Sequence, residues 1–215
     1  MSSDVRRVFL DAAAATSALV AHPAVGAAWD APSALDRMTV GELAAHVARA
    51  GVLVRVYLDA SPDDSGASGE VDAVGYYLSF GELADVESDL SRGVRQRARD
   101  GAAAGHAAVV DAMRAAVADL RSALPALPRA RSITVRDGIV LPLDEYLRTR
   151  IIELVVHGDD LCASVPELAV EAPHEARDVA VEVLVGLAVR RHGSLALVRA
   201  LTRRERDDVQ ALRVF

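Results

Sequence analysis

The sequence predicts an all-α protein: a four-helix bundle with a small β-hairpin before the fourth helix and an extra C-terminal helix. Apolar residues make up 52% of the 215 residues but aromatic residues only 4%, so alanine, valine and leucine must fill the core. Such a composition favours closely packed helices over a β-sandwich. Four long segments also show helical periodicity of their apolar residues. We expect a bundle over residues 1–165, with residues 166–215 forming a helix and a short tail packed on it.

The first two helices are expected at residues 3–21 and 40–59. The first segment is rich in alanine and places its larger apolar residues near one side. A loop at 23–37 should separate the two helices. Thr39 and Glu42 have the spacing of a capping box, in which each side chain hydrogen-bonds the backbone N–H of the other residue. The second helix should therefore begin immediately after Thr39.

The middle of the chain predicts a polar loop, a short turn and a long helical region. Residues 60–70 are rich in serine, aspartate and glycine, which is typical of a loop. A short helical turn is expected over 72–78. Residues 82–123 have helical periodicity, but Gly101 and Gly105 argue against one unbroken helix, because each costs about 1 kcal/mol relative to alanine.

The last third of the chain predicts a hairpin followed by two helices. Residues 133–141 alternate and contain an Asp-Gly pair, which indicates a β-hairpin turn. Helices are expected at 143–164 and 174–191. Residues 203–215 read as a short charged tail, in which the Arg-Arg-Glu-Arg run is a solvated helix face.

The composition excludes several classes of function. The net charge of −7 and the lack of a basic stripe with interleaved aromatics argue against nucleic-acid binding. No long uncharged apolar run predicts a membrane span, and the N-terminal residues lack the features of a signal peptide. We therefore expect a cytoplasmic protein.

Its one cysteine, Cys162, is expected to fill the core and not to act as a nucleophile. Lysine and asparagine are absent, which indicates a high-GC bacterial genome.

The most informative residues are Glu153 and His157, which lie four positions apart in an otherwise apolar helical run. This spacing stacks the two side chains on one face of a helix. If that face is buried, the carboxylate and the imidazole need a partner to offset the cost of burial. A divalent metal ion is one such partner. The alternative is a lightly paired couple on the protein surface.

His46 is the candidate for a third ligand, because its neighbours in the second helix face the core. Two histidine nitrogens and one carboxylate oxygen suit Zn²⁺, Ni²⁺ or Fe²⁺ and leave coordination positions open. Open positions are typical of catalytic or ligand-capturing sites, whereas structural zinc sites are usually closed. The alternative is a core histidine hydrogen-bonded to a backbone carbonyl.

Other polar residues share the face of the fourth helix at spacings of three or four: Tyr146, Arg150 and Asp160. Asp160 is a candidate to orient a ligand histidine by hydrogen bonding, or else a surface acid. Arg150 is a candidate anchor for a substrate carboxylate through its bidentate fork, or else the partner of Glu42 or another acid. Nucleotide-binding, serine-hydrolase and zincin motifs are all absent from the sequence.

Two segments resemble the motifs of the mycothiol-dependent maleylpyruvate isomerase N-terminal family, which belongs to the DinB-like superfamily of metal-binding four-helix bundles. The first is Met38-Thr-Val-Gly-Glu-Leu-Ala-Ala-His-Val-Ala-Arg49, preceded by Trp29. The second is Arg148-Thr-Arg-Ile-Ile-Glu-Leu-Val-Val-His-Gly-Asp-Asp-Leu161. The resemblance extends over roughly residues 5–165.

The resemblance implies that His46, Glu153 and His157 bind a divalent metal, most often zinc. It also implies that the thiol of mycothiol binds at the open metal position as a thiolate. In the isomerase reaction the thiolate adds to a cis double bond, rotation follows, and elimination gives the trans product. Mycothiol belongs to high-GC actinobacteria, in agreement with the composition.

The resemblance leaves the reaction open. Full isomerases of this family carry a C-terminal domain with an essential arginine, which maps to no position among the roughly 50 residues after the bundle. We therefore expect an isomerase or S-transferase that combines a small-molecule thiol with a small electrophile. The alternative is a non-catalytic module that binds a metal or a small molecule. A monomer or a homodimer is expected.

Overall fold

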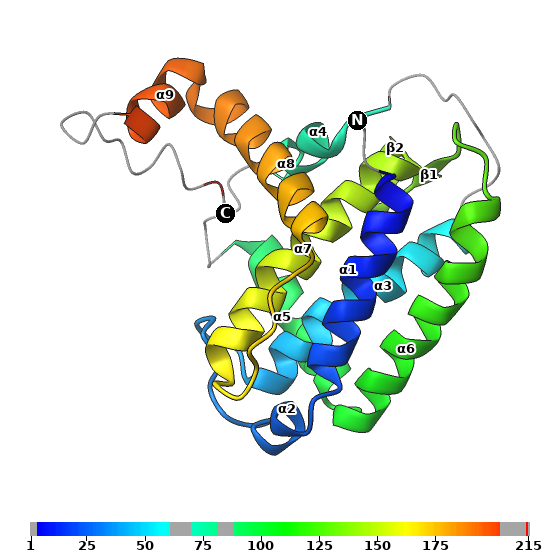
Figure 1. Cartoon of the computed structure of the whole chain (residues 1–215), viewed down its shortest axis with the longest axis vertical. Helices are drawn as coiled ribbons and strands as arrows, with labels where there is room; N and C mark the ends of the chain where they lie inside the picture. The colour runs from blue at the N-terminus through cyan, green and yellow to red at the C-terminus, as the bar shows by residue number, and fades with distance from the viewer. Residues whose placement is uncertain (1–3, 61–69, 81–87, 203–213, 215) are drawn as a thin grey trace.

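The predicted four-helix bundle is confirmed. Four long helices run side by side, and each packs against two of the others, in the order α1–α7–α3–α6 and back to α1 (Figure 1). Their bounds are Val5–Val20 for α1, Val40–Ala60 for α3, His106–Ala123 for α6 and Leu143–Ser164 for α7. The computed structural model describes residues 4–60, 70–80, 88–202 and 214.

The start of α3 is fixed by the predicted capping box and by a tryptophan. The Thr39 N–H donates to Glu42 Oε2 at 3.0 Å, and the Glu42 N–H donates to Thr39 Oγ1 at 3.2 Å. The Gly41 N–H donates to the Trp29 carbonyl at 2.8 Å. A Cβ on Gly41 would lie 2.5 Å from Trp29 Cε2, so the indole packs where only glycine leaves room. These contacts set the position of the first turns of α3.

One helix in the first half of the chain was not predicted, and the long helical region is interrupted as Gly101 and Gly105 indicated. Within the expected loop at 23–37 the structure contains a short helix, α2 (Pro23–Ala27), which begins with a proline at its first position. The long region expected at 82–123 is divided into α5 (Asp89–Ala102) and α6. Gly105 separates the two with a φ of +82°, a left-handed conformation that glycine adopts without the steric cost of a Cβ.

The predicted hairpin is present at the start of α7. Strands β1 (Ser132–Thr134) and β2 (Val140–Pro142) pair antiparallel, with Ile133 opposite Leu141. The connection includes a short 3₁₀ turn, Arg136–Gly138, in which the predicted Asp-Gly pair has positive φ. Leu143 follows β2 directly, so the hairpin sets where α7 begins.

Three further helices pack around the bundle: α4 (Ala73–Leu78), α8 (His174–His192) and α9 (Ser194–Thr202). Helix α8 packs against both α7 and α4, and α9 packs against α8. The short turn at α4 and the helix at α8 were predicted, but α9 was not recognised as a separate helix. The division at residues 165 and 166 stays a prediction, and the Arg-Arg-Glu-Arg run lies outside the described residues. None of the described helices is long and apolar enough to span a membrane.

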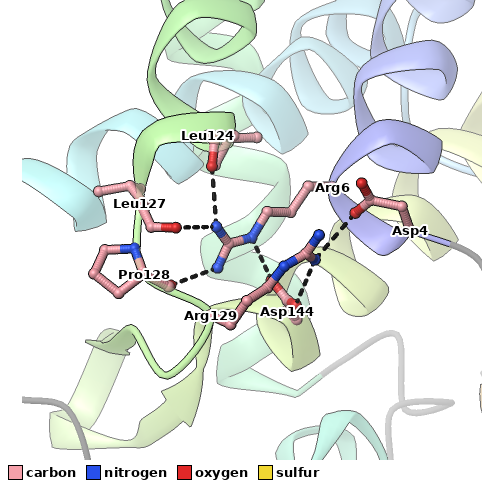
Figure 2. A network of polar contacts seen from close by, with 7 residues as sticks. All are labelled: Asp4, Arg6, Leu124, Leu127, Pro128, Arg129 and Asp144. Atoms are coloured by element: carbon pink, nitrogen blue, oxygen red, sulfur yellow. Dashed lines mark hydrogen bonds and ion pairs between the residues drawn. The ribbon is translucent and has the colours of Figure 1, made fainter.

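A buried arginine joins three helices at one end of the bundle (Figure 2). Arg6, near the start of α1, donates to the carbonyl oxygens of Leu124, Leu127 and Pro128, which follow α6. Its Nε also donates to Asp144 Oδ1, in the first turn of α7, at 2.7 Å. The guanidinium therefore ties α1 to carbonyl oxygens beyond the end of α6, two of which, those of Leu124 and Pro128, also accept a backbone N–H.

Candidate metal centre

The three predicted ligands come together between α3 and α7. His46 lies in the second turn of α3, and Glu153 and His157 lie one turn apart on α7. The Glu153 Oε2 atom is 3.3 Å from His157 Nε2 and 3.8 Å from His46 Nε2. The two imidazole rings meet edge to face with their centroids 4.7 Å apart. One ligand atom from each residue lies within 4.8 Å of the other two.

This donor set fits a small divalent metal ion. Zinc binds histidine nitrogen and carboxylate oxygen at about 2.0–2.2 Å, so neighbouring ligand atoms of a tetrahedral site lie roughly 3.4 Å apart. The two measured separations, 3.3 and 3.8 Å, are close to that value. Each ligand side chain is about one fifth exposed, so the site has an open side. Three ligands and an open side are the arrangement of a site that also accepts an exogenous ligand.

The apolar run on α7 explains why these two polar residues point to the bundle interior. Ile151, Ile152 and Leu154 are almost completely buried, against α1, α3 and α8 between them. Their burial fixes the rotation of α7 about its axis. Glu153 and His157 then face α3, the helix that carries His46. The spacing of four, which suggested a shared face, is therefore realised in a packed helix.

Glu153 uses its two carboxylate oxygens for different partners. Oε2 faces the two histidines, whereas Oε1 lies 3.1 Å from the hydroxyl of Tyr77 on α4. The same hydroxyl lies 3.0 Å from the Thr149 carbonyl oxygen. Tyr77 therefore holds the carboxylate in one orientation. Tyr77 was not predicted as a site residue, because a tyrosine in a short apolar helix carries no sequence signal beyond core packing.

Asp160 contacts the outer nitrogen of His157. The His157 Nδ1 and Asp160 Oδ2 atoms are 2.9 Å apart. This contact directs Nε2 of the same ring toward Glu153 and His46, which is the arrangement by which a carboxylate orients a metal-binding histidine. Asp160 therefore contacts a candidate ligand histidine, as predicted. Its role toward a metal stays a prediction.

Arg150 is buried beside the same carboxylate. Its Nη2 lies 3.9 Å from Glu153 Oε1, and its Nε donates to Thr149 Oγ1 at 3.1 Å. Glu42, one of the partners considered for Arg150, instead lies 3.7 Å from Arg99 Nε. Arg150 is therefore close to the ligand set, with its guanidinium only partly used.

The charges in the site shift the pKa values of its groups in opposite directions. Burial and the neighbouring His157 lower the pKa of His46 to about 4, so His46 is neutral and able to coordinate a metal at pH 7. Although burial opposes it, hydrogen bonds to Asp160 and Glu153 raise the pKa of His157 to about 9. Burial is also outweighed at Glu153, where the contact with His157 and the charge of Arg150 hold the carboxyl pKa well below its usual range.

The other histidines and the cysteine have structural surroundings. In the described part of the chain His46 has no backbone carbonyl partner, and His106 makes that kind of contact, with Nε2 2.7 Å from the Val20 carbonyl. The imidazole of His22 accepts the Ala24 N–H at the start of α2. His174 is exposed and pairs with Asp178. Cys162 is partly buried and packs against the core, as expected of a small apolar residue.

Comparison with known proteins relates this arrangement to one family. The family described as mycothiol maleylpyruvate isomerase N-terminal domain matches residues 9–162. The chain is similar to the crystal structure of a mycothiol-dependent maleylpyruvate isomerase, with 17% identity, a TM-score of 0.53 and coverage of 89% of this chain and 72% of that one. A mutant of such an isomerase gives 17% identity, a TM-score of 0.52 and coverage of 86% and 69%. No curated protein matches. The structural similarity confirms the predicted fold.

Proposed function

Because this chain belongs to the mycothiol maleylpyruvate isomerase N-terminal domain family, we propose that it is a metal-dependent enzyme that uses the thiol mycothiol. Its reaction is the isomerisation of a small electrophilic metabolite or the S-transferase reaction, in which the thiol sulfur of mycothiol forms a bond to that electrophile. The observation that carries the proposal is the approach of His46, Glu153 and His157 to within 4.8 Å of one another, on a side of the bundle that is open. The metal is zinc, with nickel or iron as the other candidates.

Each residue of the site has a defined part in this proposal. His46 and His157 provide the nitrogen ligands, and Glu153 provides the oxygen ligand. Asp160 keeps the His157 ring in the orientation that presents Nε2 to the metal, because it is 2.9 Å from Nδ1. Arg150 is the anchor for a carboxylate of the substrate, because its Nη groups lie beside the ligand set and have no close acceptor among the described residues.

The chemistry follows from the open side of the site. A bound divalent metal lowers the pKa of a thiol that coordinates it and so supplies a thiolate nucleophile at neutral pH. The surrounding residues then have to hold the electrophile next to the sulfur and exclude competing water. Arg150, buried and fixed by Thr149, is suited to hold one end of the electrophile in place.

Metal analysis of the purified protein tests the ligand set. We expect about one equivalent of zinc in the wild type and a loss of most of it in His46→Ala and His157→Ala. His174→Ala is the matched control, since His174 is exposed and its pairing with Asp178 lies outside the site. Full metal content in His157→Ala, or the same loss in His174→Ala, would exclude this site.

Turnover is tested separately on the metal-loaded protein. We expect mycothiol to be needed, either catalytically with a cis-alkene substrate or stoichiometrically with other electrophiles. We expect His46→Ala and His157→Ala to lose this activity while they keep the helical circular dichroism spectrum of the wild type. Binding of mycothiol without consumption of any electrophile in a broad panel would favour the alternative function, a non-catalytic metal- or small-molecule-binding module.

A further inference from the structure

A buried tyrosine hydroxyl on the helix that carries two of the candidate ligands has no hydrogen-bond partner among the described residues. Tyr146 lies on α7, one turn before Arg150, and is completely buried. Among the described residues its Oη is the one buried side-chain polar atom without a hydrogen bond. A buried hydroxyl without a partner is unfavourable, because it has lost its hydrogen bonds to water and gained none. Phenylalanine would fill the same space without this cost, so the hydroxyl calls for a functional explanation.

Arg150, which lies over the ring of the same tyrosine, has unused hydrogen-bonding capacity. Its guanidinium carbon lies 4.9 Å from the centre of the Tyr146 ring, so the two side chains are in contact. Only its Nε donates to a protein acceptor within the described residues, while the Nη2 atom is 3.9 Å from Glu153, beyond hydrogen-bonding distance. A guanidinium has five N–H donors, of which four are on the Nη atoms. Arg150 is only 7% exposed, so a cation with free donors is held inside the protein.

The aromatic side chains packed around this pair come from α3 and α4. The Tyr57 ring on α3 lies 5.7 Å from the Tyr146 ring, and the Tyr76 ring on α4 lies 6.2 Å from it. Both contacts are edge to face. Neither hydroxyl of these two tyrosines has a hydrogen-bond partner in the part of the chain that the structure describes. Among the described residues, the charged groups that act on the Tyr146 hydroxyl are Arg150 and Glu153.

Further arginines make this side of the protein positive. Arg49 lies one turn after His46 on α3, and Arg97 lies on α5, which packs against α3. The Arg136 guanidinium lies 4.5 Å from the centre of the Phe80 ring, which in turn contacts Tyr76. Burial and the neighbouring Arg49 and Arg136 lower the pKa of Arg97, which indicates that the three cations are close together. In a chain of net charge −7, such a concentration of like charges favours an anionic ligand.

We propose that the Tyr146 hydroxyl and the Arg150 guanidinium together bind one carboxylate group of the small-molecule ligand. The arginine provides charge and a planar pair of donors, which match a carboxylate. The tyrosine provides a third donor that a neutral or a bulkier group would use less well. Tyr146 is thus a specificity-determining residue that keeps its hydroxyl for the ligand. This assignment rests on the proposed function in one respect, namely that a small molecule enters this site.

Calorimetric titration with maleate tests the proposal, with its uncharged dimethyl ester as the control ligand. The titration is performed on both metal-free and zinc-loaded protein, so that a carboxylate bound by the metal alone is recognised. We expect maleate, but not the ester, to bind the wild type in both forms. Tyr146→Phe should weaken binding about tenfold, the usual effect of losing one hydrogen bond to a charged acceptor, and Arg150→Gln should weaken it more.

Thermal unfolding of each variant separates binding from folding. We expect Tyr146→Phe to unfold at the wild-type temperature or above it, because the lost hydroxyl had no partner, while its stabilisation by maleate is reduced. Equal maleate affinity in Tyr146→Phe and wild type, or binding that requires zinc and ignores both substitutions, would overturn the proposal. A wild type that binds no maleate in either form would overturn it too. Failure of the proposed function would appear instead as absent metal or absent mycothiol turnover, with carboxylate binding retained.

Discussion

Replacing Arg6 by methionine should destabilise the protein far more than the same change at its neighbour Arg7. Arg6 is almost completely buried and makes four hydrogen bonds, three to carbonyl oxygens and one to Asp144 (Figure 2). Arg7 is half exposed and pairs with Glu175 and Asp11 on the surface. Methionine keeps most of the apolar stem, so the loss reports on the guanidinium itself.

The size of the effect can be worked from these contacts. Removing one member of a buried ion pair costs about 3–5 kcal/mol, and leaving a buried carbonyl without a partner costs about 1–3 kcal/mol. The Leu124 and Pro128 oxygens keep a backbone N–H donor, so this second cost applies to the Leu127 oxygen. Asp144 is 29% exposed and keeps Arg129 at 3.7 Å, so its charge is partly compensated after the substitution. We therefore expect a loss of about 3–5 kcal/mol for Arg6→Met. Surface ion pairs contribute about 0–1 kcal/mol, so Arg7→Met should lose no more than that.

Urea unfolding followed by circular dichroism measures this difference. The midpoint should fall clearly for Arg6→Met with an unchanged slope, and the thermal midpoint should fall by roughly 10 °C. Native proteins have a free energy of unfolding of only about 5–15 kcal/mol. The variant should therefore remain folded, but with a small free energy of unfolding. An Arg6→Met variant that is no less stable than Arg7→Met would refute the idea that this arginine joins the three helices.

Three further predictions concern the site and its supports. Gly41→Ala should reduce stability by about 1–3 kcal/mol, because its Cβ would lie 2.5 Å from Trp29, and urea unfolding should show this loss. Asp160→Asn should weaken metal binding about 10–100-fold without unfolding the protein, measured by competition with a chelator; unchanged affinity would mean that Asp160 is a surface acid. Tyr146→Phe should be as stable as the wild type or up to about 1 kcal/mol more stable, and a clear loss of stability would show that its hydroxyl has a partner.

The fold was predictable where local sequence determines structure. The capping box at Thr39 and the Asp-Gly pair in the hairpin fix backbone geometry within a few residues, and both were recognised. Helix α2 was missed because five residues carry too little periodicity to stand out from a loop. The gap between α5 and α6 was foreshadowed by Gly105, but only its positive φ shows where the helix ends.

The candidate site was predictable only in part. A spacing of four fixes which residues share a helix face, so Glu153 and His157 could be paired from the sequence, and the apolar neighbours of His46 indicated that it faces inward. The sequence did not predict which acid lies next to Arg150. That depends on how α7 packs and on the side-chain rotamers, which residue spacing does not determine. Tyr77 was missed because α4 reaches the site through tertiary packing, from a segment separated from α7 by α5, α6 and the hairpin.

The candidate ligand set depends on a single helix pair. Two ligands lie on α7, which packs against α1, α3, α4 and α8. The third lies on α3, whose first turn is held by the capping box and by Trp29. Helix α8 packs against α7 and α4, so changes in α8 or α9 act on the distance between His46 and Glu153 only through those helices. That distance is set by the α3–α7 contact, so the capping residues of α3 and the indole of Trp29 position the site although they touch none of its ligand atoms.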